Sequence, residues 1–203
     1  MAKLGLMQNN SMANKIIALT GGIGSGKSVA LTILNSLGEN TLSCDVITAQ
    51  LYDRADVKSA LAKAFADCVK SDGVTPDRKK IAQVVFCDKQ KLKWLTDYLT
   101  PLVLDECLSR ANALSGRVFV EVPLLFECNA TDKFDCVIVI TRLLENRITA
   151  VMERSNLTRA QVLERINSQF DYDNADLSSY LVIPNNTTID DLKKNLLTIL
   201  NKL

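Results

Sequence analysis

Short, dense runs of apolar residues recur along the chain at spacings that predict buried strands. The strongest are residues 118–122 and 136–140, which are rich in β-branched side chains and nearly unbroken, as expected of strands covered on both faces. Residues 16–19 and 180–183 form two similar runs, and residues 41–42 are a weaker candidate. Five strands are therefore predicted.

Between these runs, apolar residues return every three or four positions, which is the period of an amphipathic helix. This pattern covers residues 29–37, where Gly38 suits a helix end, and residues 189–200 near the C-terminus. Residues 57–68, 81–85 and 92–103 follow the same pattern, and we expect Pro101 to bend or split the last of these helices. The alternation of strands and helices predicts an α/β core of three layers around a five-stranded parallel sheet, interrupted by an all-helical insertion at residues 56–114.

Composition excludes several kinds of chemistry. The chain has 203 residues, enough for one domain or a core with an insertion, and its net charge of +1 argues against attachment to nucleic acid by a general basic surplus. It contains no histidine, so a Ser-His triad, an imidazole base and a histidine metal ligand are excluded.

The remaining composition favours a cytoplasmic protein. The six cysteines are never closer than eight residues apart, so they form no Cys-x-x-Cys pair and read as free thiols of a reducing compartment. No apolar stretch approaches the length of a membrane helix, and residues 1–14 form a polar extension without a signal-peptide core. We expect no membrane partner and no nucleic-acid partner.

The most specific motif is a glycine-rich loop that follows the first strand. Gly21-x4-Gly26-Lys27-Ser28 satisfies the P-loop pattern and opens the first predicted helix. Glycines let backbone N-H groups approach phosphate oxygens, Lys27 would reach the β- and γ-phosphates, and Ser28 would ligate Mg²⁺. The alternative is a glycine turn that only lets a helix pack against a strand. The predicted nucleotide-binding residues of this segment are Gly22, Gly24, Ser25, Gly26, Lys27, Ser28 and Val29.

Other residues narrow the choice among P-loop proteins. The chain has no Asn-Lys-x-Asp motif of small GTPases downstream of the loop, and Glu121, the nearest carboxylate to a Walker B position, reads as lying inside its strand. Five of the nine arginines fall between 142 and 165, within a predicted lid segment at residues 141–170. Arg147 and Arg154 are two helical turns apart and could neutralise a transferring phosphoryl group. The alternative is a solvated helix in which glutamates pair with these arginines. The pattern favours a nucleotide or metabolite kinase.

Taken together, these motifs resemble the dephospho-coenzyme A kinase family. The resemblance runs from about Lys15 to the last helix and is carried by residues 18–28, by Glu121-Val122-Pro123-Leu124-Leu125-Phe126-Glu127 and by Phe134-Asp135. It implies ATP-dependent phosphorylation of the ribose 3′-hydroxyl of dephospho-coenzyme A, the last step of coenzyme A synthesis. It also implies a nucleotide-binding core at residues 15–55 and 115–203, a coenzyme A domain at 56–114 and a lid.

The resemblance also implies site residues. Asp45 matches the catalytic aspartate, which would orient the acceptor hydroxyl, take its proton and help Ser28 to hold Mg²⁺; by itself it could equally be a helix N-cap. Lys27 and Arg154 are the other predicted catalytic residues, and Arg147 is a predicted nucleotide contact. Dephospho-coenzyme A is the implied substrate, ATP and Mg²⁺ the cofactors, and the protein a monomer or small homo-oligomer. The predicted substrate-binding residues are Thr20, Asp45, Pro123, Leu124 and Leu125.

The chain departs from the family pattern on the substrate side and in the lid. The family usually has Asp, His and Arg where this chain has Ser43, Thr100 and Ala150, with Arg147 one turn away as a substitute for the missing arginine. Residues 170–173, beginning with Phe170, replace usual basic residues, and a late Asn-x-Gly-like loop reads Asn185-Asn186-Thr187. Another P-loop nucleoside or nucleotide kinase, or a non-catalytic nucleotide-binding module, therefore remains an alternative.

Overall fold

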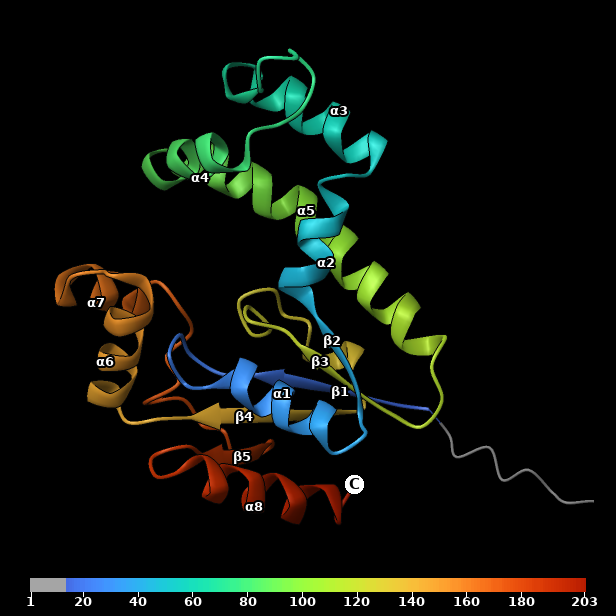
Figure 1. Ribbon diagram of the computed structural model, residues 1–203, viewed down its shortest axis with the longest axis vertical. Helices are drawn as coiled ribbons and strands as arrows, with labels where there is room; N and C mark the ends of the chain where they lie inside the picture. Colours follow the sequence, from blue (N-terminus) through green and yellow to red (C-terminus); the bar gives the residue numbers. More distant parts are fainter. Residues whose placement is uncertain (1–13) are drawn as a thin grey trace, which may run out of the picture. The chain divides into compact units, whose positions relative to one another are not determined.

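The computed structural model describes residues 14–203, so the predicted extension at residues 1–14 lies outside the described residues except for Asn14. Strands and helices alternate along most of this length (Figure 1). In chain order the elements are β1 (Lys15–Thr20), α1 (Lys27–Ser36), β2 (Asn40–Ser43), α2 (Cys44–Leu51), α3 (Ala55–Ala64), η1 (Ala66–Cys68), α4 (Arg78–Cys87), α5 (Lys89–Asn112), β3 (Arg117–Glu121), η2 (Thr131–Lys133), β4 (Cys136–Thr141), α6 (Leu144–Ser155), α7 (Arg159–Asn167), β5 (Leu181–Pro184) and α8 (Ile189–Leu200).

The five predicted strands form one sheet with the order β2-β3-β1-β4-β5. The pairs β1–β3, β1–β4 and β4–β5 are parallel, and Ile17 of the central strand lies between Phe119 and Cys136 in register. Strand β1 is the central strand of this sheet, and its side chains are buried from Ile16 to Thr20. The predicted five-stranded α/β fold is confirmed.

Helices α1 and α8 pack together on one face of this sheet (Figure 1). The core between them and the strands is purely aliphatic and aromatic, with Ile17, Phe119 and Ile138 fully buried. Helix α8 begins with a capping box in which the Thr188 side chain accepts from the Asp191 N-H and the Asp191 side chain accepts from Thr188. This core fixes the position of the loop that joins β1 to α1.

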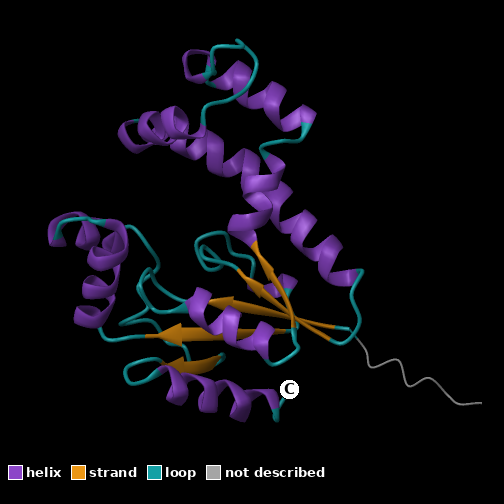
Figure 2. Cartoon of the chain, in the orientation of Figure 1, coloured by secondary structure: helices purple, strands orange, loops and turns teal. Residues whose placement is uncertain are grey.

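The described residues divide into two compact units, residues 14–41 with 111–203 and residues 42–110. The second unit contains helices and no strand of its own beyond the end of β2 (Figure 2). Its apolar cluster joins α3, α4 and α5 through Leu61, Ile81 and Leu99. The helical insertion was predicted at residues 56–114, whereas this unit starts earlier, at Leu42, and also contains α2.

Two local predictions about helices differ from the structure. Pro101 does not split its helix, because α5 runs unbroken from Lys89 to Asn112 around it. Leu99 and Val103 are buried on either side of Pro101, and their packing offsets the backbone hydrogen bond that proline removes. The other difference concerns Asp45, which is not an N-cap: Ser43 holds that position, and Asp45 lies in the first turn of α2.

Candidate phosphate-binding site

The loop between β1 and α1 has a backbone that glycine permits. Gly24 and Gly26 have φ angles of 77° and 101°, in the left-handed region where other residues are strained. A Cβ atom on Gly26 would also collide with the side-chain amide of Asn185. Since Gly26 is the N-cap of the ten-residue helix α1, the loop leads directly into a helix N-terminus, which favours anions.

Lys27 brings a positive charge into this loop. Its side chain is buried, and Nζ donates to the carbonyl oxygen of Gly21 at 2.5 Å and to that of Gly22 at 3.1 Å. These bonds fold the lysine back along the loop rather than out into solvent. The structure therefore holds a cation inside the loop, and a lysine is the residue with which a P-loop neutralises nucleotide phosphates.

Ser28 meets a carboxylate that the sequence analysis did not assign to the site. The Ser28 hydroxyl donates to Oε1 of Glu121 at 2.8 Å, and Glu121 is only 5% exposed. Glu121 was expected inside its strand, but β3 ends at this residue. The sequence feature that could have assigned Glu121 to the site is its position as a carboxylate at the end of an apolar strand. A hydroxyl and a carboxylate are the hard oxygen donors that suit Mg²⁺.

Side chains from the C-terminal half of the chain bind the carbonyl groups of the same loop. Arg147 Nε donates to the Ile23 carbonyl at 3.1 Å, and an Arg142 guanidinium nitrogen donates to that of Gly24 at 3.3 Å. The Asn185 amide donates to the Ser25 carbonyl at 2.8 Å. Three consecutive carbonyls are thus bound from outside the loop.

Arg147 is almost completely enclosed. Its side chain is 3% exposed and forms an ion pair of 3.2 Å with Asp173, whose carboxylate is half exposed. A Cβ atom on Gly22 would lie 2.5 Å from the Arg147 guanidinium. The sequence predicted a nucleotide contact for Arg147, and the structure places its guanidinium on the carbonyl side of the loop.

The segment after α7 also contacts the loop. Gln169 Oε1 accepts the Ile23 N-H at 2.7 Å, and the Tyr172 hydroxyl lies 3.1 Å from the Thr20 hydroxyl. Thr20, a predicted substrate contact, is fully buried in this arrangement. The replacement of basic residues at 170–173 therefore builds a set of contacts to the loop.

The segment Val122–Glu127, which follows β3, contacts the residues after α7. Phe126 stacks on Phe170 with ring centroids 4.4 Å apart, and Glu127 Oε1 accepts the Phe170 N-H at 2.9 Å. Of the three predicted substrate contacts here, Leu125 is fully buried, Leu124 is exposed and Pro123 is intermediate.

Two further predicted catalytic residues are accessible. Asp45 is exposed on α2, in the helical unit, where the neighbouring Cys44 thiol lies 3.4 Å from the Cys107 thiol of α5. This contact fixes the start of α2 against α5, and the Cys44 thiol holds the pKa of Cys107 below its usual value. Arg154 is exposed on α6, two turns after Arg147, and Val29 is exposed on α1.

Comparison with known proteins identifies the family. The family model described as dephospho-CoA kinase matches residues 15–191. The chain belongs to the dephospho-CoA kinase family. A relative named dephospho-CoA kinase from Helicobacter pylori is 33% identical over 192 residues, which cover 92% of this chain and 96% of the relative.

Solved structures agree with membership of the dephospho-CoA kinase family. A crystal structure from Thermus thermophilus has a TM-score of 0.81 and 31% identity, and covers 93% of this chain and 97% of that one. A dephospho-CoA kinase from Campylobacter jejuni has a TM-score of 0.68 and 26% identity, and covers 92% and 96%. The P-loop of this protein thus lies in the same fold as these two solved structures.

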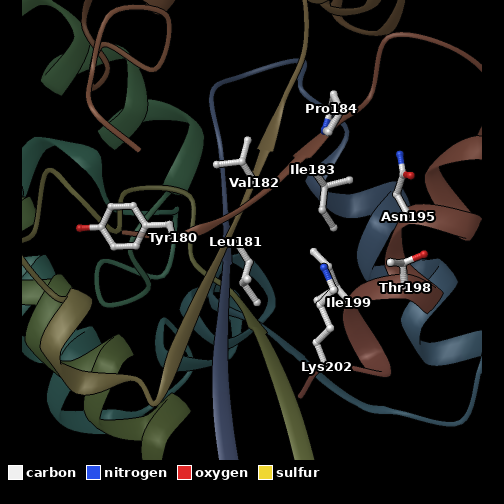
Figure 3. A pocket seen from close by; sticks show the side chains of 9 residues that line it. All are labelled: Tyr180, Leu181, Val182, Ile183, Pro184, Asn195, Thr198, Ile199 and Lys202. Atoms are coloured by element: carbon white, nitrogen blue, oxygen red, sulfur yellow. The ribbon is translucent and has the colours of Figure 1, made fainter. Parts of the chain in front are cut away.

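A separate hollow in this family member lies away from the loop. It encloses about 250 Å³ between β5 and α8, and the side chains that line it include Ile183, Asn195 and Thr198 (Figure 3). None of its lining residues belongs to the P-loop.

Within residues 14–203, no helix has the length and hydropathy to cross a membrane. The predicted cytoplasmic location, the oligomeric state and the absence of a nucleic-acid partner stay predictions.

Proposed function

We propose that this protein transfers the γ-phosphoryl group of MgATP to the ribose 3′-hydroxyl of dephospho-coenzyme A, giving coenzyme A and ADP. The observation that carries the proposal is the P-loop with its enclosed Lys27 and its Ser28–Glu121 pair, in a chain that matches the dephospho-CoA kinase model over residues 15–191. The coenzyme A substrate is taken from the names of the family and of its relatives.

The loop supplies the nucleotide side of this reaction. Its N-H groups and the start of α1 favour the phosphates, and Lys27 neutralises charge on the β- and γ-phosphates. Ser28 and Glu121 would hold Mg²⁺, which shields phosphate oxygens when bound. Among residues 14–203 no cluster of three or more His, Cys, Asp or Glu residues could hold a metal. A site of one hydroxyl and one carboxylate, completed by substrate phosphates and water, is the arrangement that Mg²⁺ accepts.

Asp45 and Arg154 are assigned to the acceptor and to the transferring group. Asp45 would accept the proton of the ribose hydroxyl and orient its oxygen; exposure at the first turn of α2 suits that role. Arg154, exposed near the end of α6, would neutralise charge on the phosphoryl group as it moves.

The test is ADP release from MgATP by the purified protein, measured with dephospho-coenzyme A, adenosine or AMP as acceptor. We expect turnover with dephospho-coenzyme A alone. Asp45→Asn should lower kcat by about 10²- to 10⁴-fold because it removes the proton acceptor. Asp53→Asn is the matched control, since it removes an exposed carboxylate soon after the same helix and should retain the wild-type rate.

Other outcomes would select the alternatives. Comparable turnover with adenosine or AMP would indicate a kinase for another nucleoside or nucleotide. Binding of MgATP without ADP release for any acceptor would indicate a non-catalytic nucleotide-binding module, and Asp45→Asn would then change nothing.

A further inference from the structure

The unusual feature of the phosphate site is that its loop carbonyl groups accept hydrogen bonds from distant parts of the chain. We call the side of the loop where these carbonyl groups lie its carbonyl side. The carbonyls of Ile23, Gly24 and Ser25 each accept a donor from a residue more than a hundred positions away in the chain. A carbonyl that turned toward a bound phosphate would repel it. The Ile23 and Ser25 N-H groups are already bonded within the protein, and donors that hold these carbonyls outward keep the other N-H groups of the loop available for phosphate oxygens.

Arg147 makes the most enclosed of these contacts. Its planar guanidinium donates to the Ile23 carbonyl through Nε and to Asp173 through another nitrogen. With 3% of the side chain exposed, its charge needs a partner, and the Asp173 carboxylate supplies one. The pair thus links the loop to the segment that follows α7.

The helix that carries Arg147 packs directly on the loop. A Cβ atom on Gly24 would lie 2.6 Å from the Arg147 carbonyl oxygen and 2.9 Å from Val151 Cγ2. Ile23 packs against the cluster that joins α6 and α7, which contains Ile148 and Val162. The first turns of α6 therefore belong to the support of the loop.

We propose that Arg147 is a positioning residue, which holds the P-loop in its phosphate-binding conformation and depends on Asp173 to do so, without itself contacting the nucleotide. The proposal rests on the proposed function, since it concerns the MgATP site of that reaction. It replaces the nucleotide contact that the sequence indicated for Arg147 with a role exerted through the loop backbone.

The two roles of Arg147 predict opposite effects of removing its carboxylate partner. If Arg147 bound phosphate directly, Asp173 would compete for the guanidinium, and Asp173→Asn would tighten MgATP binding. If Arg147 positions the loop, Asp173→Asn loosens the guanidinium and weakens binding. Asp176→Asn is the matched control: Asp176 is an exposed carboxylate on the same connection, it accepts the Ser178 N-H, and its loss changes the net charge equally.

Calorimetry with MgATP on the wild type and both variants, at one ionic strength and without an acceptor, makes the comparison. We expect Asp173→Asn to bind about tenfold more weakly than Asp176→Asn, the loss expected of a charged hydrogen bond. Equal or tighter binding would overturn the proposal. Arg147→Lys repeats the test from the other partner, because an ammonium cannot reproduce the planar fork, and wild-type affinity in that variant would also contradict it.

Amide hydrogen exchange of the unliganded protein gives a readout that a direct contact would not change. Residues 21–28 should exchange faster in Asp173→Asn than in Asp176→Asn, by more than the difference between the thermal unfolding midpoints of the two variants accounts for. Unchanged exchange in the loop would refute the positioning role. A wild type that binds MgATP but releases no ADP with any acceptor would refute the proposed function, and these binding and exchange comparisons would still decide the role of Arg147.

Discussion

At the scale of single residues, the site is made of pairs that lie far apart in the sequence. Ser28 and Glu121 are separated by 93 positions, and Arg147 and Asp173 by 26. In each pair a buried or largely enclosed polar group is matched by a partner, as the cost of burying an unpaired group requires. The Ser28–Glu121 pair joins the start of α1 to the end of β3, and the Arg147–Asp173 pair lies on the carbonyl side of the loop.

Glu121→Gln should raise the Mg²⁺ concentration needed for half-maximal turnover by about 10- to 100-fold, because the amide keeps a hydrogen bond to Ser28 but removes the negative charge. A magnesium titration of the steady-state rate at saturating ATP measures the effect. Glu153→Gln, which removes an exposed carboxylate on α6, is the control and should follow the wild-type curve. A Glu121→Gln curve that coincided with it would remove Glu121 from the metal site.

At the scale of elements, the connection between α7 and β5 contacts both the loop and the segment that follows β3. Its aromatic residues Phe170, Tyr172 and Tyr180 all contact Phe126, which follows β3. Burial raises the pKa of Tyr172 to about 12, although its bond to Thr20 acts in the opposite direction. The neutral phenol is therefore the form that the folded protein holds.

This shift predicts a loss of stability in alkaline solution. An unfolded tyrosine loses its proton at about pH 10, whereas Tyr172 in the folded protein keeps its proton up to about pH 12. The stabilisation is therefore complete below pH 10 and decreases as the pH rises toward 12. Urea unfolding at pH 9 and pH 11 should show a larger fall for the wild type than for Tyr172→Phe, which has no proton to lose there. Equal falls in the two proteins would contradict the assignment.

At the scale of the whole molecule, the chain forms two compact units with separate apolar clusters. Leu61 is fully buried in the cluster of the helical unit, and Leu196 is buried in the cluster of the sheet, α1 and α8. Each unit thus has an apolar core of its own, as a separately cooperative part of a protein requires.

Leu61→Ala should cost about 2–5 kcal/mol of stability, because it leaves a cavity in the helical cluster. Hydrogen exchange should accelerate mainly in residues 42–110, while β1 and β4 keep their protection. Leu196→Ala is the counterpart and should accelerate exchange mainly in the other unit. Uniform acceleration throughout the chain in both variants would show a single cooperative structure instead.

The sequence by itself determined the strands, most helices and the P-loop, because each is encoded by local period and residue type. The apolar runs predicted β1, β3, β4 and β5 to within a residue or two at their ends, since strands covered on both faces need nearly continuous apolar side chains. It missed α2, whose eight residues are too few for a clear helical period, and of the two effects expected of Pro101, a bend or a split, the split does not occur.

Only the tertiary structure decided which polar groups meet. In the sequence, Glu121 is a carboxylate within a predicted apolar strand and has no evident partner. The pairing of β3 with β1 brings it to Ser28. The sequence indicated Arg147 as a nucleotide contact, and the packing of α6 encloses it against the loop and Asp173. Sequence periodicity reports which face of an element is buried, whereas the partner of a buried charge depends on long-range contacts that no local pattern contains.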